Sequence, residues 1–224
     1  MLAPLTDFDW TTLHARYRTK CKRFNSVSEC LRELIPLPLK NSEDLDLYYQ
    51  LAGRFCLEKG SPSGISVATY KAMLYWKLYS IGMGVAEGHC REIAKNPTET
   101  EETLTEVCRF IPEQLSRSVN DVRNLVLALD KFPLRGMKSK CTFPVRTVFL
   151  HFVYPETVPI FDRMVLQAVG YTKEAAKKAI YKESVLLQYI EHIWSLEKRY
   201  LHLLPQNARE TPLRLVEMAL WVNR

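Results

Sequence analysis

The side chain most capable of chemistry in this sequence is a single aspartate, Asp162. It follows Pro159, an isoleucine and a phenylalanine, and it stands directly before a short segment of helical pattern that ends at Gly170. A carboxylate in this position accepts hydrogen bonds from the first backbone N–H groups of a helix, which stabilises the helix by about 1 kcal/mol. The residues themselves therefore predict a helix N-cap, and any chemical role of Asp162 would be additional to it.

A basic loop over residues 132–144 is the second feature with functional potential. Its three cations are Arg135, Lys138 and Lys140, and its only glycine is Gly136. The whole chain carries a formal charge of +6 and has a sequence pI of about 9.0. Such a surface favours polyanions, among which nucleic acid is the commonest partner of a basic protein.

Two further patterns are interpreted as structural rather than functional. The basic runs at residues 16–23 and 173–182 are typical of solvated helix faces. His151 stands between Leu150 and Phe152 in an apolar segment, which predicts a hydrogen-bonded histidine of the core.

The composition predicts a folded, helical protein. Of the 224 residues, 47% are hydrophobic and 25% are charged, as in globular proteins. There are only eight glycines and no long run of alternating polar and apolar residues, and both observations argue against a sheet-based fold. The predicted class is therefore all-α.

The cysteines and the hydrophobic pattern exclude several classes of protein. Six cysteines are spaced too widely for a CxxC pair or a zinc knuckle. We therefore expect no metal site, and we expect free thiols in a reducing, cytoplasmic compartment. The most apolar stretch, residues 145–161, is interrupted by charged residues and two prolines, so no membrane span is expected.

Helical periodicity and cap signals divide the chain into ten or eleven segments. Ser26 with Glu29, and Thr98 with Glu101, have the spacing of capping boxes. The expected helices lie at about 7–20, from 26 to before Pro36, 42–60, 66–79, 86–95, 98–111, 119–129, 145–154, 162–170, 172–204 with a break near 183, and 211–222.

The stretch from Pro144 to Gly170 resembles the second hairpin helix and catalytic-aspartate segment of the helix-hairpin-helix (HhH-GPD) DNA glycosylase superfamily. In that superfamily an apolar helix and a short connection lead to a hydrophobic-hydrophobic-Asp-x-x-Val signature, which residues 160–165 match. The chain is more similar still to an uncharacterised, divergent branch of the superfamily. Residues 75–77 (Tyr-Trp-Lys) and 213–221 also resemble that branch, and all these pieces together cover under half of the chain.

The resemblance implies a two-lobed, all-α fold of the HhH-GPD type, with a central lobe at 40–143 and a second lobe formed by 1–39 with 144–224. It also implies a monomer that acts on double-stranded DNA without a cofactor. Asp162 would be the catalytic residue, assisting hydrolysis of the N-glycosidic bond of a flipped, damaged or mispaired base. The implied base-pocket residues are Tyr70, Tyr75, Trp76 and Lys77. The implied DNA-backbone contacts are Arg135, Gly136, Lys138, Lys140, Arg146 and Arg163.

Two departures from the superfamily leave alternatives open. The phosphate-binding hairpin usually carries two glycines, whereas the loop here has Gly136 alone. Where bifunctional members have a Schiff-base lysine, this chain has Arg146, whose guanidinium stays protonated, so no β-lyase activity is expected. The rivals to a monofunctional glycosylase are a non-catalytic helical DNA-binding module that kept the scaffold and an interaction or structural protein.

Overall fold

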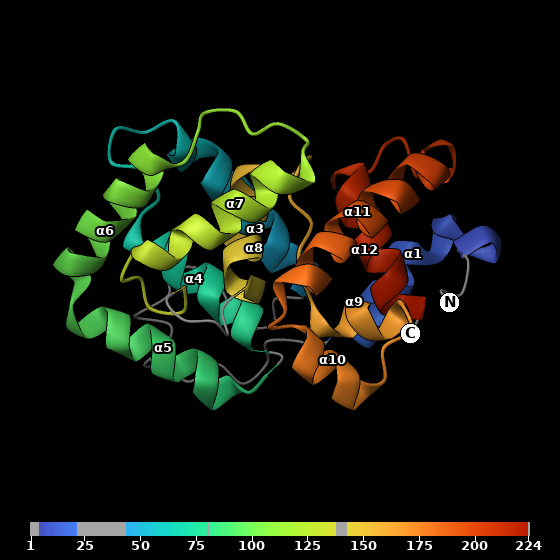
Figure 1. Ribbon diagram of the computed structural model, residues 1–224, viewed down its shortest axis with the longest axis horizontal. Coiled ribbons are helices and arrows are strands. Elements are labelled where there is room, and N and C mark those ends of the chain that lie inside the picture. The colour runs from blue at the N-terminus through green and yellow to red at the C-terminus, as the bar shows by residue number, and fades with distance from the viewer. Residues whose placement is uncertain (1–4, 22–43, 80, 138–142, 224) are drawn as a thin grey trace. The chain divides into compact units, whose positions relative to one another are not determined.

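The computed structural model describes residues 5–21, 44–79, 81–137 and 143–223, and every regular element within these ranges is a helix (Figure 1). The predicted all-α class is therefore confirmed for the described part of the chain. None of its helices combines the length and the apolar character needed to cross a membrane.

The chain divides into two compact units that are interleaved in sequence. Unit 1 comprises Met1–Lys20, Gln114–Leu127 and Lys140–Arg224, and unit 2 comprises Cys21–Glu113 and Ala128–Ser139. These boundaries are not those of the expected lobes: residues 114–127, for example, were expected in the central lobe and group with unit 1.

Unit 2 is built around one helix that is buried over most of its surface. The α-helices among its described residues are α3 (Asp44–Lys59), α4 (Val67–Leu78), α5 (Met83–Lys95) and α6 (Pro97–Phe110), followed by the short 3-10 helix η3 (Leu129–Lys131). Helix α4 contacts α3, α5 and α6, and nine of its twelve residues are buried. A helix that is apolar around its full circumference belongs in a core.

Unit 1 is likewise centred on a buried helix. Its short 3-10 helices are η1 (Leu5–Asp7), η2 (Trp10–Thr12) and η4 (Leu201–Leu203). Its α-helices are α1 (Leu13–Lys20), most of α7 (Val119–Ala128), α8 (Phe143–Val153), α9 (Arg163–Ala168), α10 (Lys173–Ala179), α11 (Glu183–Tyr200) and α12 (Pro212–Asn223). Helix α12 contacts α1, α9 and α11 and is buried over most of its length.

Several predicted helix starts are confirmed because their caps are local. Ser66 caps α4, with its hydroxyl accepting from the N–H of Thr69 at 3.2 Å. Thr211 caps α12, with its hydroxyl accepting from the N–H of Arg214 at 3.2 Å. The expected break near Glu183 separates α10 from α11.

Other expected boundaries are wrong. Helix α6 begins at Pro97, with Asn96 as its N-cap, so Thr98 lies inside the helix and forms no capping box. Proline at the first helical position has a φ already suited to the helix, which explains this start. The expected helix at 7–20 is divided because Asp9 caps η2, accepting from the N–H of Thr11 at 3.0 Å. The helix expected from Ser26 lies outside the described residues.

Helix α9 ends in a motif that requires a glycine. Gly170 has a φ of +100°, and its N–H donates to the carbonyl of Gln167 at 3.1 Å. The next N–H, that of Tyr171, donates to the carbonyl of Leu166 at 3.1 Å. This pair of bonds is the Schellman pattern, in which the residue after the cap adopts a left-handed conformation.

Gly170→Ala should lower the free energy of unfolding by about 1–2 kcal/mol, because an L side chain is strained in the left-handed region. Gly60→Ala is the control, since Gly60 is not among the described glycines with a positive φ and a Cβ built there meets nothing within 4 Å. Urea denaturation of both variants measures the difference. Equal stability of the two would contradict the assigned role of Gly170.

Candidate functional site

Asp162 stands at the start of α9 and caps that helix. Its backbone is extended, with φ −130° and ψ 135°, and its Oδ1 accepts from the N–H of Met164 at 2.6 Å. The predicted N-cap is therefore confirmed. The residue is half-buried, whereas Phe161 before it is completely buried. The carboxylate thus stands where a buried connection reaches the surface of unit 1.

Three buried side chains hold the backbone of that connection just before Asp162. Thr147, on α8, accepts from the N–H of Phe161 at 3.0 Å. Tyr189, on α11, donates its hydroxyl proton to the carbonyl of Ile160 at 2.6 Å. The carboxylate of Glu217, on α12, accepts from the N–H of Ile160. Helices α8, α11 and α12 therefore fix the chain entering α9.

Burial and the nearby negative charges keep the hydroxyl of Tyr189 protonated. Burial raises the pKa of Tyr189 well above its ordinary value, and the negative charges of Glu217 and Asp162 raise it further. Tyr189 therefore remains a hydrogen-bond donor at neutral pH. Glu217 lies 3.6 Å from the guanidinium of Arg214, which also donates to the hydroxyl of Tyr17 at 2.9 Å. A buried carboxylate is tolerated only with such partners.

His151 is a core residue, as predicted. Its ring is completely buried and its Nδ1 lies 2.8 Å from the carbonyl oxygen of Val158. This contact holds an earlier part of the same connection against α8.

The aromatic candidates belong to unit 2, whereas Asp162 belongs to unit 1. Tyr70 and Tyr75 are completely buried, and Trp76 and Lys77 are each 8% exposed. Tyr70 donates its hydroxyl proton to the carbonyl of Arg135 at 2.7 Å, and burial raises the pKa of both tyrosines. In the structure the four side chains pack within the core of unit 2, and their assignment to a base pocket stays a prediction.

The basic candidates are found in different environments. Arg135 is exposed, and Gly136 follows it in a turn with a φ of +86°. Lys138 and Lys140 lie outside the described residues. Arg163, in the first turn of α9, is half-buried.

Arg146 is a cation of the core of unit 1. It is 2% exposed, and its guanidinium donates to the carbonyl of Val126, on α7, at 3.3 Å. The same guanidinium lies 5.9 Å from the ring centre of Phe143. These contacts hold α7 to α8, and a role for Arg146 in binding phosphate stays a prediction.

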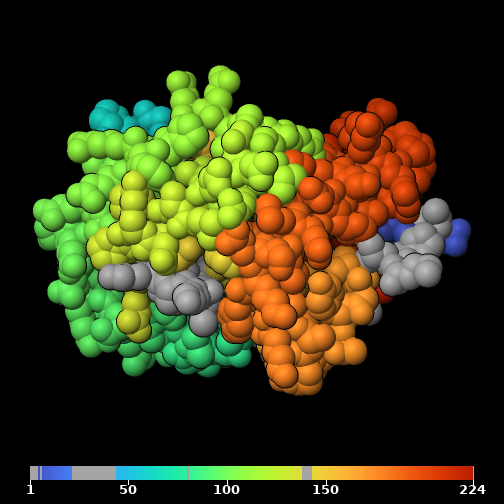
Figure 2. Space-filling model, viewed as in Figure 1, coloured from blue at the N-terminus to red at the C-terminus, as the bar shows by residue number. Residues whose placement is uncertain are grey.

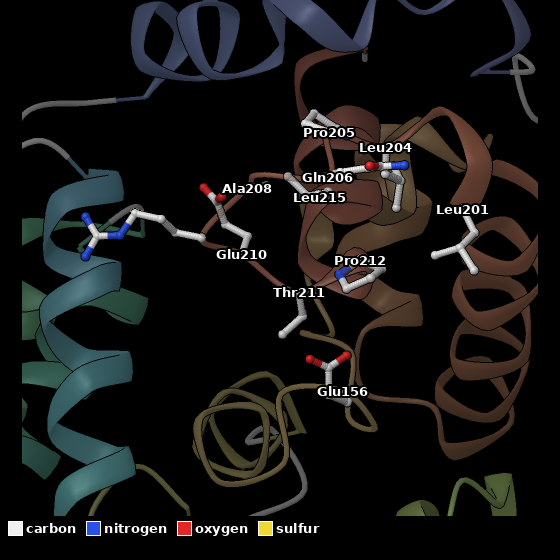
Figure 3. A pocket seen from close by; sticks show the side chains of 11 residues that line it. Glu156, Leu201, Leu204, Pro205, Gln206, Ala208, Glu210, Thr211, Pro212 and Leu215 are labelled. Atoms are coloured by element: carbon white, nitrogen blue, oxygen red, sulfur yellow. The ribbon is translucent and has the colours of Figure 1, made fainter.

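Unit 1 also contains an open pocket of about 410 Å³, which Asp162 does not line. Figure 3 shows Glu156 at one edge of this pocket and Leu204, Pro205 and Gln206 at the other. The pocket is also lined by Glu210, whose carboxylate oxygen lies 2.9 Å from Nε2 of His14. The remaining lining residues are Leu201, Ala208, Arg209, Thr211, Pro212 and Leu215.

The network around Ile160 was not predicted from the sequence. One signal for it is visible afterwards: Glu217 is the only acidic residue in the apolar stretch from Leu213 to Val222. Thr147 and Tyr189 carry no comparable signal, because threonine and tyrosine are common on partly buried helices.

No protein-family model, curated protein or solved structure matches this chain. Within the described residues, no group of histidine, cysteine, aspartate and glutamate side chains is arranged to hold a metal ion. The function of this chain must therefore be inferred from the residues around Asp162 themselves.

Replacing Asp162 should separate its capping role from its charge. Asp162→Ala removes the acceptor for the N–H of Met164 and should lower the free energy of unfolding by about 1 kcal/mol, whereas Asp162→Asn keeps an acceptor and should cost only a few tenths. Thermal and urea denaturation of both variants test this. An equally large loss in both would show that the charge, and not the cap, stabilises α9.

Tyr189→Phe should lower the free energy of unfolding by about 1–3 kcal/mol, because the buried carbonyl of Ile160 loses its donor. Tyr181→Phe is the matched control: Tyr181 is 49% exposed, and its replacement should change stability by less than about 0.5 kcal/mol. If the two variants are equally stable, the hydroxyl of Tyr189 does not hold the connection.

Proposed function

We propose that this chain is a monofunctional DNA N-glycosylase in which Asp162 is the catalytic residue. The observation that carries the proposal is the position of its carboxylate. It is half-buried, fixed through Oδ1 to the start of α9, and preceded by a connection that three helices hold. A charged group held in one geometry can stabilise a transition state without reorganising.

The reaction would be hydrolysis of the bond between C1′ of the sugar and the base nitrogen. As that bond breaks, its electron pair leaves with the base, and positive charge develops on the sugar. The carboxylate of Asp162 would stabilise this charge and accept a proton from the water whose oxygen bonds to C1′. The released base takes up a proton, so the products are a free base and an abasic site.

Base release by hydrolysis does not require an amine side chain that bonds covalently to C1′ of the sugar. By the resemblance, Arg146 stands at about the position of the lysine of bifunctional superfamily members. Its guanidinium is buried and donates to the carbonyl of Val126. A permanently protonated group cannot attack C1′. The proposal therefore includes base release and excludes β-lyase cleavage of the DNA strand.

A second candidate is a DNA-binding module that performs no chemistry. It is favoured by the loop around Gly136, which carries one glycine rather than the two of the superfamily hairpin. Base release distinguishes the two candidates, since only the enzyme converts a modified duplex into one with an abasic site.

Asp162→Asn should abolish base release while leaving affinity for duplex DNA within about threefold. The assay uses end-labelled duplexes that each carry one modified base, such as uracil, hypoxanthine or 8-oxoguanine, followed by hot alkali to cleave abasic sites. On the duplex that the unmodified protein processes, the variant should be slower by at least about 100-fold, the lower range for loss of an acid–base or electrostatic group.

Asp121→Asn is the matched control, because Asp121 is an exposed acidic residue in the first turn of α7. It should release base at the rate of the unmodified protein. Equal rates for Asp162→Asn and Asp121→Asn would remove Asp162 from the reaction. Failure of the unmodified protein on every duplex would favour the non-catalytic module.

A further inference from the structure

One short segment of unit 1 is strongly basic. From Arg163 to Lys182 there are five basic side chains and one acidic side chain, Glu174, whereas the whole chain has 31 basic and 25 acidic residues. This segment comprises α9, α10 and the residues that lead into α11. The segment therefore carries a net charge of +4.

Helix α10 presents its lysines on one side. Ala176 and Ala179 are buried, and α10 contacts α9, so its small apolar side chains face the unit. Lys173, Lys177 and Lys178 are exposed, and their spacing of four and five residues places them within one half of the helix surface. Figure 2 shows this part of the chain, in orange, at the surface of the molecule.

Arg163 belongs to the same positive field. The pKa of Glu174 is lowered first by its bond to Lys177, at 2.8 Å, and then by the charges of Lys173 and Arg163. All three cations are therefore close enough to act on one carboxylate. Since Arg163 directly follows Asp162, the positive surface extends from α10 to the start of α9.

Two exposed residues continue the surface beyond α10. Tyr181 is 49% exposed, and Lys182 is exposed beside it. The ion pair between Lys177 and Glu174 does not cancel the field, because an exposed pair of this kind is weak and screened by salt. The four lysines and one arginine outnumber Glu174 and the two flanking acids, Asp162 and Glu183. Such a surface attracts a chain of phosphates.

We propose that Arg163, Lys173, Lys177, Lys178 and Lys182 form a phosphate-binding face that holds the backbone of double-stranded DNA. The choice of DNA as the polyanion rests on the proposed function, and the face deepens that function by assigning backbone contacts to α9 and α10. Lysine binds phosphate as a point charge without reading sequence. The face would therefore bind undamaged and damaged duplexes alike.

The test compares two triple variants of the full chain. Lys173→Gln, Lys177→Gln and Lys178→Gln together remove three cations of the face. The control removes three exposed cations elsewhere: Lys95→Gln, Lys198→Gln and Arg199→Gln. Circular dichroism and thermal melting confirm that both variants fold. Fluorescence anisotropy with an undamaged labelled duplex then gives affinity from about 50 to about 200 mM NaCl.

The α10 variant should bind the duplex at least about tenfold more weakly at the lowest salt. Each lost phosphate contact also removes about 0.9 from the slope of log affinity against log salt, so the slope should become shallower by about 2–3. The control variant has the same net charge but should keep the slope and stay within about threefold in affinity.

The proposal is overturned if both triple variants lose the same affinity, because net charge alone would then explain binding. It is also overturned if the unmodified protein shows no salt-dependent binding, or if polyglutamate displaces it as effectively as a second duplex does. The single variant Lys178→Gln provides an independent measure, with an expected change in slope of about 0.9.

Failure of this proposal is distinguishable from failure of the proposed enzyme. Loss of duplex binding in the α10 variant, with no base release by the unmodified protein, supports the face and rejects the glycosylase. Base release by an α10 variant that binds DNA as the unmodified protein does rejects the face and supports the glycosylase.

Discussion

The chain entering α9 is extended and buried, and its backbone polar groups cannot be satisfied by a helix or a sheet. A buried N–H or C=O without a partner costs about as much as a lost hydrogen bond. Here the partners are side chains: Thr147 for Phe161, and Tyr189 with Glu217 for Ile160. The position of Asp162 depends on this arrangement, because the carboxylate is carried by the residue that follows.

The same constraint explains why polar groups are buried in α12. Glu217 is 1% exposed and Arg214 is 6% exposed, which would be unfavourable for isolated charges. Their pairing, the acceptor role of Glu217 and the hydroxyl of Tyr17 supply the missing partners. The polar residues buried in α12 thus stabilise the non-helical connection that leads into α9.

Local features of the fold could be predicted from the sequence, whereas features that depend on distant residues could not. The caps at Ser66, Asp162 and Thr211 involve atoms within three residues, so the sequence pattern contains the whole interaction. The start of α6 was misplaced because two local signals compete, and the proline at position 97 prevails over the capping box.

The candidate site divides in the same way. The type of residue at its centre and its place at a helix start follow from the sequence. The partners of Ile160 come from residues 29 and 57 positions later, and no periodicity relates them. The burial of Arg146 could not be predicted from the sequence either, because a cation is buried in a core only where the fold provides an acceptor such as the carbonyl of Val126.

Ile160 and Glu217 lie 57 residues apart in the sequence, so the ribosome makes them at different times. When the ribosome has made the segment around Asp162, the carboxylate that receives the N–H of Ile160 does not yet exist. The connection between α8 and α9 therefore acquires its last partner only after α12 emerges. The neighbourhood of Asp162 is thus among the final parts of unit 1 to reach its native geometry.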